Sequence, residues 1–167
     1  MFPFIFIINS SNISLTVKEN IMVPMILEKK PSTYMEKKVF DLMNLFGIKH
    51  IANKYPYQIS GGEQQRVAVS RALVNEPDII LADEPTGNLD SKSSSTVLEC
   101  FDKIVTELQT AVLVVTHDVF AASYCDKVTF IQDGSIHSHI VKKGTRKEFI
   151  DQIMDSLAIL GGRTYDI

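Results

Sequence analysis

Two adjacent acidic residues behind an apolar run are the first feature of this sequence that could do chemistry. Asp83 and Glu84 follow Ile79–Ala82, four consecutive apolar residues. Such a run predicts a fully buried strand, and α/β proteins place ligands at the carboxyl ends of parallel strands. One carboxylate could share a metal ion with phosphate oxygens, while its neighbour points the other way along the pleat and is free for water. Many unrelated α/β sites carry acidic residues at such a strand end, so this feature alone does not identify the chemistry.

A second candidate site is the segment Ser60–Gln64, which reads Ser-Gly-Gly-Glu-Gln. Ser60 and Glu63 have the spacing of a capping box at a helix start. Gly61 and Gly62 leave the amides of the first turn bare. A phosphate is favoured at such a helix end, because free N–H groups and the positive end of the helix dipole point the same way. Ser-Gly-Gly by itself is more often a plain loop or cap.

Two further polar segments follow these sites in the chain. Gly87–Asp90 comes directly after Pro85 and Thr86, and Thr116–Asp118 closes the next apolar run. Together with Ser60–Gln64 and Asp83-Glu84, they resemble the D-loop, H-loop, signature helix and Walker B strand of the ATP-binding cassette (ABC) family. Four elements in this order and at this spacing are hard to obtain by chance. The resemblance covers nearly the whole chain, but only the carboxyl-terminal part of the family's domain.

The resemblance implies a role for each matching residue. In the family the Walker B aspartate helps to hold Mg²⁺ and the following glutamate polarises the attacking water, which would be Asp83 and Glu84. His117 would contact the γ-phosphate of ATP. Two ATPase domains dimerise head to tail, so that each signature helix contacts the ATP held by the other subunit, and Asp90 would lie at the same interface. The expected ATP-contacting residues of the signature are Ser60, Gly61, Gly62, Glu63 and Gln64.

The 167 residues lack the family's P-loop. That loop requires Gly-x-x-x-x-Gly-Lys-Ser/Thr, and none of the 8 glycines is followed by lysine. The Q-loop also departs from the family pattern, because Ile7 falls where its glutamine is expected. We therefore expect a cassette truncated at its amino-terminal side, which by itself neither binds ATP tightly nor hydrolyses it. The alternative is a non-catalytic binding or regulatory module that docks on a full-length ABC ATPase.

The composition favours a single globular domain. Hydrophobic residues make up 45% of the chain, and a net charge of -3 without a basic block disfavours nucleic acid as a partner. Met1–Ile8 is apolar but too short to span a bilayer, and we interpret it as a strand buried on both faces. Cys100 and Cys125 have no paired spacing, which indicates free thiols in a reducing cytosol. The other histidines are expected to have no site role: His50, His137 and His139.

Caps and breakers predict where the helices begin and end. Pro24 should limit or kink the first helix, Gly47 should end the second, and Ser91 should cap the helix after the D-loop. Alternating strand and helix patterns predict a mainly parallel sheet with helices on its faces. Four pairs have capping-box spacing: Thr16 with Glu19, Thr33 with Glu36, Ser60 with Glu63, and Thr145 with Glu148.

The predicted fold class is thus α/β, the carboxyl-terminal part of a P-loop NTPase cassette with a small helical subdomain. The helical subdomain with the signature helix should cover about residues 16–75, and the core sheet residues 1–8 and 76–167. In the family this subdomain receives the coupling helices of a membrane permease, so the chain would act at the cytoplasmic face of the cell membrane. The run Ala82–Asp90 is most similar to ATPases of lipoprotein release, macrolide export and antimicrobial-peptide export. Phe120–Cys125 and Lys143–Phe149 resemble bacitracin-resistance transporters.

Overall fold

The structure is a computed structural model that describes residues 4–6 and 11–162. It divides into two compact units, Met1–Val115 and Thr116–Ile167, and each is described by itself. The expected first strand is thus described only over Phe4–Phe6, and Ile7, at the expected Q-loop position, lies outside the described residues. The predicted domain boundaries remain a prediction.

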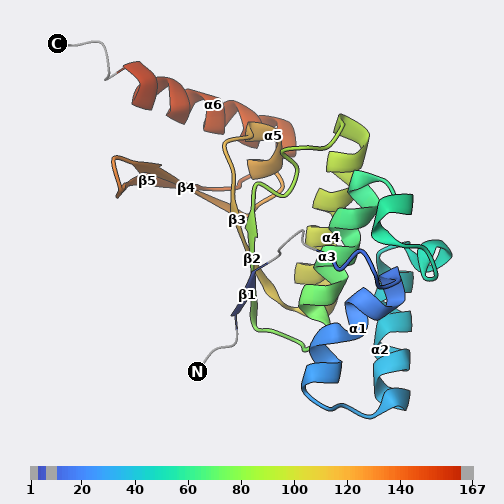
Figure 1. The fold of residues 1–167 in the computed structure, drawn as a ribbon. Coiled ribbons are helices and arrows are strands. Elements are labelled where there is room, and N and C mark those ends of the chain that lie inside the picture. The colour runs from blue at the N-terminus through green and yellow to red at the C-terminus, as the bar shows by residue number, and fades with distance from the viewer. Residues whose placement is uncertain (1–3, 7–10, 163–167) are drawn as a thin grey trace. The chain divides into compact units, whose positions relative to one another are not determined.

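The first unit combines a sheet with a group of helices (Figure 1). Its elements are, in order, β1 (Phe4–Phe6), α1 (Val17–Leu27), α2 (Ser32–Leu45), the 3₁₀ turns η1 (Lys49–Ile51) and η2 (Pro56–Gln58), α3 (Gly61–Leu73), β2 (Ile79–Asp83), α4 (Ser91–Leu108) and β3 (Ala111–Val115). The second unit contains α5 (Val119–Ala122), β4 (Lys127–Gln132), β5 (Ser135–Val141) and α6 (Arg146–Gly162).

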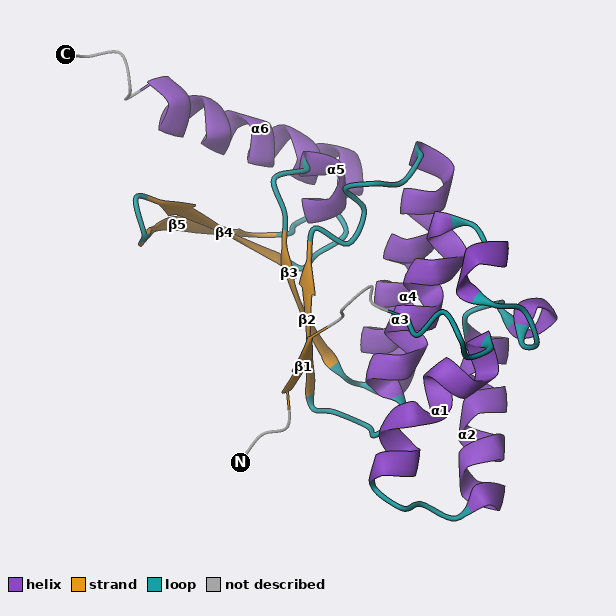
Figure 2. Ribbon diagram, in the orientation of Figure 1, coloured by secondary structure: helices purple, strands orange, loops and turns teal. Residues whose placement is uncertain are grey.

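The sheet of the first unit is parallel, as predicted. Its strands lie in the order β1-β2-β3, with Phe4 opposite Ile79 and Ile79 opposite Ala111. Parallel neighbours need a crossover connection, which the helices supply. Figure 2 shows α1 to α4 gathered on one side of this sheet.

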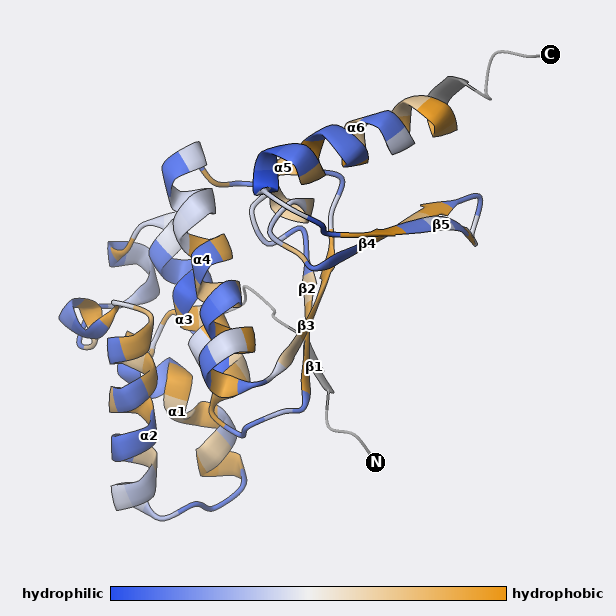
Figure 3. Cartoon of the chain, turned by 180° about the vertical axis from the view of Figure 1, so that it is seen from behind, coloured by the Kyte–Doolittle hydropathy of each residue, from blue (hydrophilic) through white to orange (hydrophobic). Residues whose placement is uncertain are grey.

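Burial in β2 and β3 alternates along each strand. Ile80 and Ala82 are buried, whereas Leu113 and Val115 on the neighbouring strand are 53% and 57% exposed. The prediction that Ile79–Ala82 is fully buried was therefore wrong, because the helices described in the first unit lie on one side of its sheet. β3 is nevertheless hydrophobic along its length, as its orange colour in Figure 3 shows.

Helix α1 begins at the predicted capping box but does not stop at its proline. The side chain of Thr16 accepts a hydrogen bond from the Glu19 N–H at 3.3 Å, and the Thr16 N–H donates to the Glu19 carboxylate at 2.7 Å. The helix continues through Pro24 to Leu27. Met25 is fully buried just beyond the proline, and burying such a side chain contributes about 1.5–3 kcal/mol, comparable to the cost of a proline in a helix.

Helix α2 starts one residue before the predicted cap. Its N-cap is Pro31, which makes no side-chain hydrogen bond, and Thr33 lies inside the first turn. The Thr33–Glu36 capping box was therefore wrong, and Glu36 instead forms an ion pair with Lys18 at 3.5 Å. The fixed φ of Pro31 presets the extended cap conformation, so no polar side chain is needed there. Gly47 ends the helix as predicted, with a φ of 66°.

The second unit is a hairpin with a helix on one face. β4 and β5 are antiparallel, and the Asp133-Gly134 turn has positive φ at both residues, as a tight hairpin turn requires. The predicted Thr145 cap forms, since the Thr145 N–H donates to the Glu148 carboxylate at 2.7 Å. Phe149 on α6 is fully buried against Phe130. Leu157 on the same helix is exposed.

Candidate functional site

Ser60 caps α3 as the sequence predicts. Its hydroxyl oxygen accepts from the Glu63 N–H at 3.3 Å, and its own N–H donates to Oε2 of Glu63 at 2.8 Å. The Ser60 hydroxyl also donates to the same oxygen at 2.9 Å. Burial raises the pKa of Glu63, but hydrogen bonds from Ser60 and His50 outweigh burial and leave that pKa below its ordinary value. Glu63 is therefore a carboxylate that orients the Ser60 hydroxyl.

The two glycines after Ser60 lie against the segment that follows β2. A Cβ on Gly61 would lie 3.2 Å from Cδ2 of Leu89, and a Cβ on Gly62 would lie 3.0 Å from Cβ of Ser93. Gly62 is also buried. The two glycines therefore allow α3 to pack closely on α4, and they also leave the amides of the first turn uncovered. The structure brings the predicted signature and D-loop segments together.

Asp90, rather than Ser91, is the N-cap of α4. One carboxylate oxygen of Asp90 accepts from the N–H groups of Lys92 and Ser93, each at 3.0 Å, and the other accepts from the Ser93 hydroxyl at 2.6 Å. These bonds, the one from the Ser93 hydroxyl foremost, lower the pKa of Asp90. The Ser91 cap was wrong because Asp90 already has the extended backbone of a cap and reaches two orphan amides. A role at a subunit interface stays a prediction for Asp90.

Gln64 holds the loop that leads into the signature. Its Nε2 donates to the carbonyl oxygen of Pro56 at 2.9 Å, and the rings of Tyr55 and Tyr57 in the same loop stack 5.6 Å apart. This amide therefore ties the first turns of α3 to η2. The predicted ATP contact of Gln64 stays a prediction.

Asp83 and Glu84 stand at the carboxyl end of β2, as predicted. Asp83 is exposed and ends the strand. Glu84 has a φ of 41°, a left-handed backbone that is uncommon for a residue with a side chain and costs about 1–3 kcal/mol. Its N–H donates to the carbonyl oxygen of Val115 at 2.9 Å, which holds the turn against β3. Strained residues concentrate at functional sites, and this one is the predicted water-polarising carboxylate.

His117 is exposed and precedes α5 in the second unit. Asp118 caps that helix by accepting from the Phe120 N–H at 2.9 Å, and its own N–H donates to the Thr116 hydroxyl at 3.0 Å. These bonds order the backbone on either side of His117. Because Glu84 belongs to the first unit, a joint role for the two residues stays a prediction.

His50 is a residue of this site that sequence reasoning missed. Its Nε2 lies 3.1 Å from Oε1 of Glu63. The two residues are 13 positions apart and belong to η1 and α3, so no local pattern links them. Only the tertiary structure places an imidazole beside the signature carboxylate.

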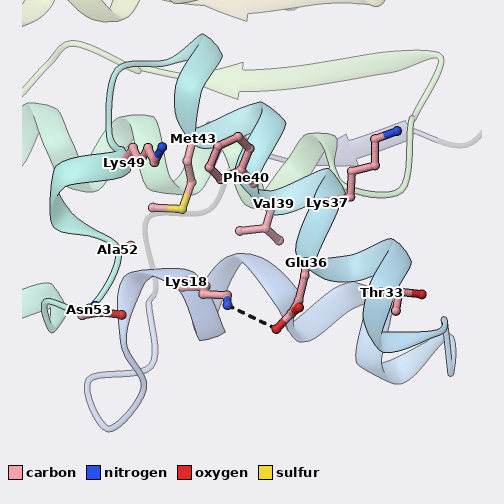
Figure 4. Close-up of a pocket in the computed structure, with 10 residues that line it drawn as sticks. All are labelled: Lys18, Thr33, Glu36, Lys37, Val39, Phe40, Met43, Lys49, Ala52 and Asn53. Carbon is pink, nitrogen blue, oxygen red and sulfur yellow. Dashed lines mark hydrogen bonds and ion pairs between the residues drawn. The ribbon is translucent and has the colours of Figure 1, made fainter.

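A pocket of about 650 Å³ lies in the helical part of the first unit (Figure 4). Phe40 and Met43 form much of its apolar wall. Lysines stand around them: Lys18 is paired with Glu36, and Nζ of Lys49 lies 4.2 Å from the centre of the Phe40 ring. The lining residues are Lys18, Thr33, Glu36, Lys37, Val39, Phe40, Met43, Lys49, Ala52 and Asn53.

Within residues 4–6 and 11–162 there is no metal-binding cluster. In that part of the chain no three His, Cys, Asp or Glu side chains gather closely enough to hold a metal ion. None of the helices described there has the length and apolar composition to cross a membrane. Cys100 and Cys125 are free thiols, and burial raises the pKa of Cys100 to about 11.

A parallel sheet with an acidic pair at the end of β2, together with a serine-capped helix that starts with two glycines, is typical of α/β nucleotide-binding proteins. The family model described as ABC transporter matches residues 5–87. The ABC transporter ATP-binding protein YxdL of Bacillus subtilis is 43% identical over 92% of this chain and 60% of its own length. The bacitracin export ATP-binding protein BceA of Halalkalibacterium halodurans is 44% identical over 89% of this chain and 59% of its own length.

A solved structure agrees with these sequence relatives. The dimeric, post-hydrolysis ATP-binding cassette MJ0796 bound to ADP and Pi superposes with a TM-score of 0.72 at 32% identity, covering 86% of this chain and 65% of that one. The chain therefore belongs to the ABC transporter family, and it matches part of the ATP-binding domain. It spans about 60% of the length of the two relatives.

Proposed function

We propose that this chain is an ATP-binding subunit of an ABC exporter and supplies the signature half of a shared ATP site. The start of α3 carries the proposal. There an exposed serine cap and a glycine first turn present a hydroxyl and bare amides at a positive helix end. The Ser60 hydroxyl and the amides of Gly61 and Gly62 would bind the terminal phosphate of ATP held by a second cassette.

The acidic residues fit the metal that accompanies ATP. Mg²⁺ is usually bound by one or two carboxylates together with substrate phosphates, and it would neutralise phosphate charge. The exposed carboxylate of Asp83 at the end of β2 suits this role. Glu84 would orient water and His117 would contact the γ-phosphate only at an ATP site formed on the chain that carries them. None of the glycines in the 167 residues is followed by lysine. The ATP site that takes its signature from this chain would therefore draw its P-loop, Walker B residues and H-loop from the second cassette, and Glu84 and His117 would be idle there.

The pocket of Figure 4 supports a membrane permease as a further partner. Its apolar wall suits the apolar face of an amphipathic helix, and its rim carries three lysines and one glutamate. A cytoplasmic helix of the permease would dock there and hold the chain at the inner face of the cell membrane. The exported substrate would be a peptide antimicrobial, which the similarity to a protein named for bacitracin export supports.

The test uses a mixed dimer of this chain and a full-length ABC ATPase whose own signature serine is replaced by arginine. The only complete ATP site then combines the partner's P-loop with the signature of this chain. Ser60→Arg in this chain should lower the ATPase rate at least about tenfold, because a bulky cation fills the phosphate seat. Glu84→Gln should change the rate less than about twofold, because the Walker B residues of that site belong to the partner.

Two results would contradict the proposal. An unchanged ATPase rate with Ser60→Arg would mean that the signature of this chain has no role in ATP hydrolysis. It would favour the alternative, in which this chain is a regulatory module that docks on the ATPase through another surface. A loss with Glu84→Gln as large as that with Ser60→Arg would mean that a nucleotide site forms on this chain itself.

A further inference from the structure

Three side chains form a continuous chain of polar contacts at the start of α3. Nε2 of His50 lies 3.1 Å from Oε1 of Glu63, and Oε2 of Glu63 receives both the N–H and the hydroxyl of Ser60. A carboxylate only accepts hydrogen bonds, so Nε2 must carry a proton for the first contact to form. The contact thus uses the oxygen of Glu63 that Ser60 leaves free.

His50, at one end of this series of contacts, and Glu63, in its middle, differ in exposure. The side chain of His50 is 63% exposed, whereas that of Glu63 is 19% exposed. Glu63 is therefore held mainly by its partners, with little solvent to take their place. A carboxylate held at both oxygens cannot rotate about its last bond without losing a hydrogen bond. Loss of the His50 contact would leave the Glu63 carboxylate held by Ser60 alone, so the direction of the Ser60 hydroxyl would be less firmly fixed.

We propose that His50 is a positioning residue for the signature: it fixes the Glu63 carboxylate, which in turn aims the Ser60 hydroxyl at the phosphate. This inference rests on the proposed role of Ser60 at a shared ATP site. In this role His50 acts through Glu63 and not on the nucleotide itself. Because His50 belongs to η1, a shift of this turn of the helical subdomain would alter the orientation of the Ser60 hydroxyl.

Three substitutions separate positioning from folding. His50→Leu keeps the approximate size of the side chain and removes the donor. His50→Gln restores an N–H near the place of Nε2. His139→Leu makes the same chemical change on β5, at an exposed residue outside the site, and serves as the control.

The first readout is the ATPase rate of the mixed dimer described above, as a function of ATP concentration. His50→Leu should raise the apparent KM for ATP about two- to fivefold, the range expected for one exposed charged contact, and change kcat less than about twofold. His50→Gln should recover most of the affinity, and His139→Leu should change neither constant. Equal KM values for His50→Leu and His139→Leu would overturn the proposal.

The second readout needs no partner and separates this inference from the proposed function. The Glu63 carboxyl group is titrated by NMR in the chain itself. His50→Leu should raise the pKa of Glu63, because His50 helps to lower it, and His139→Leu should leave it unchanged. An unshifted titration would show that the contact does not hold Glu63. A shifted titration together with a Ser60→Arg chain of normal activity would instead refute the proposed function and leave the His50 contact standing.

Discussion

The close approach of α3 to α4 predicts different costs for alanine at the two signature glycines. In Gly62→Ala the new Cβ would lie 3.0 Å from Cβ of Ser93, at least about 0.5 Å closer than carbon atoms prefer. Ser93 cannot easily retreat, because its N–H and hydroxyl are bonded to Asp90. Overpacking of this kind costs about 1–3 kcal/mol, and helix propensity returns at most about 1 kcal/mol. We expect Gly62→Ala to lower the free energy of unfolding by about 1–2 kcal/mol.

Gly61→Ala is the matched control. Its Cβ would meet only Cδ2 of Leu89, the end of a flexible side chain that can rotate away. The free energy of unfolding, measured by urea denaturation followed by far-UV circular dichroism, should change by less than about 0.5 kcal/mol.

A double mutant tests the cause of the Gly62 effect. Ser93→Gly removes the blocking Cβ and leaves Cα 3.7 Å away, so Gly62→Ala should cost about 1 kcal/mol less in that background. Equal stability of the Gly61 and Gly62 variants, or purely additive effects with Ser93→Gly, would refute the packing explanation.

Three further predictions follow from burial and charge. The pKa of Glu63 is lowered from 4.5 in the folded chain, so the ionised carboxylate stabilises the fold above pH 4.5, and this stabilisation is lost as the pH falls through the lower folded-state pKa. In an acid titration, Glu63→Gln should therefore lose stability less steeply than the original chain. Cys100 is buried, and its pKa is raised to about 11. At about pH 8 its thiol should therefore react with a thiol reagent far more slowly than the thiol of Cys125. The two rates should become equal only when urea unfolds the chain. Phe149→Ala should cost the second unit about 3–5 kcal/mol, measured by hydrogen exchange of the hairpin amides, and the exposed control Met154→Ala less than about 0.5 kcal/mol.

Local patterns predicted the parts of the site that local interactions determine. Ser60, Thr16 and Thr145 cap helices where the sequence places them, since each cap needs only a partner three residues on. Pairs of this spacing are not sufficient, however. Thr33 and Glu36 fail because the cap is Pro31, two residues before Thr33, and Ser91 fails because Asp90 competes for the same amides.

Features that depend on tertiary contacts could not be predicted in this way. The course of α1 through Pro24 depends on the burial of Met25, and the contact of His50 with Glu63 joins two elements 13 positions apart. From the sequence, the two signature glycines were explained by the bare amides that they leave at the helix start. The close approach of Ser93 explains equally well why residue 62 is a glycine. The resemblance supplied the expected roles of the site residues, which stay predictions, and the geometry shows which neighbours hold their side chains.

The position of β3 at the end of the sheet has a consequence for the handling of this protein. Among the described strands β3 pairs only with β2, so no described strand pairs with its other side, and an unpaired strand edge is a template for another chain. Its sequence, Ala-Val-Leu-Val-Val, contains neither a charge nor a proline that would block such pairing. Uncharged windows of this length and β-propensity nucleate intermolecular sheets. The solubility of the isolated chain should therefore be limited by pairing between the β3 strands of different molecules. It should improve in Leu113→Lys, which places a charge at an exposed position of β3.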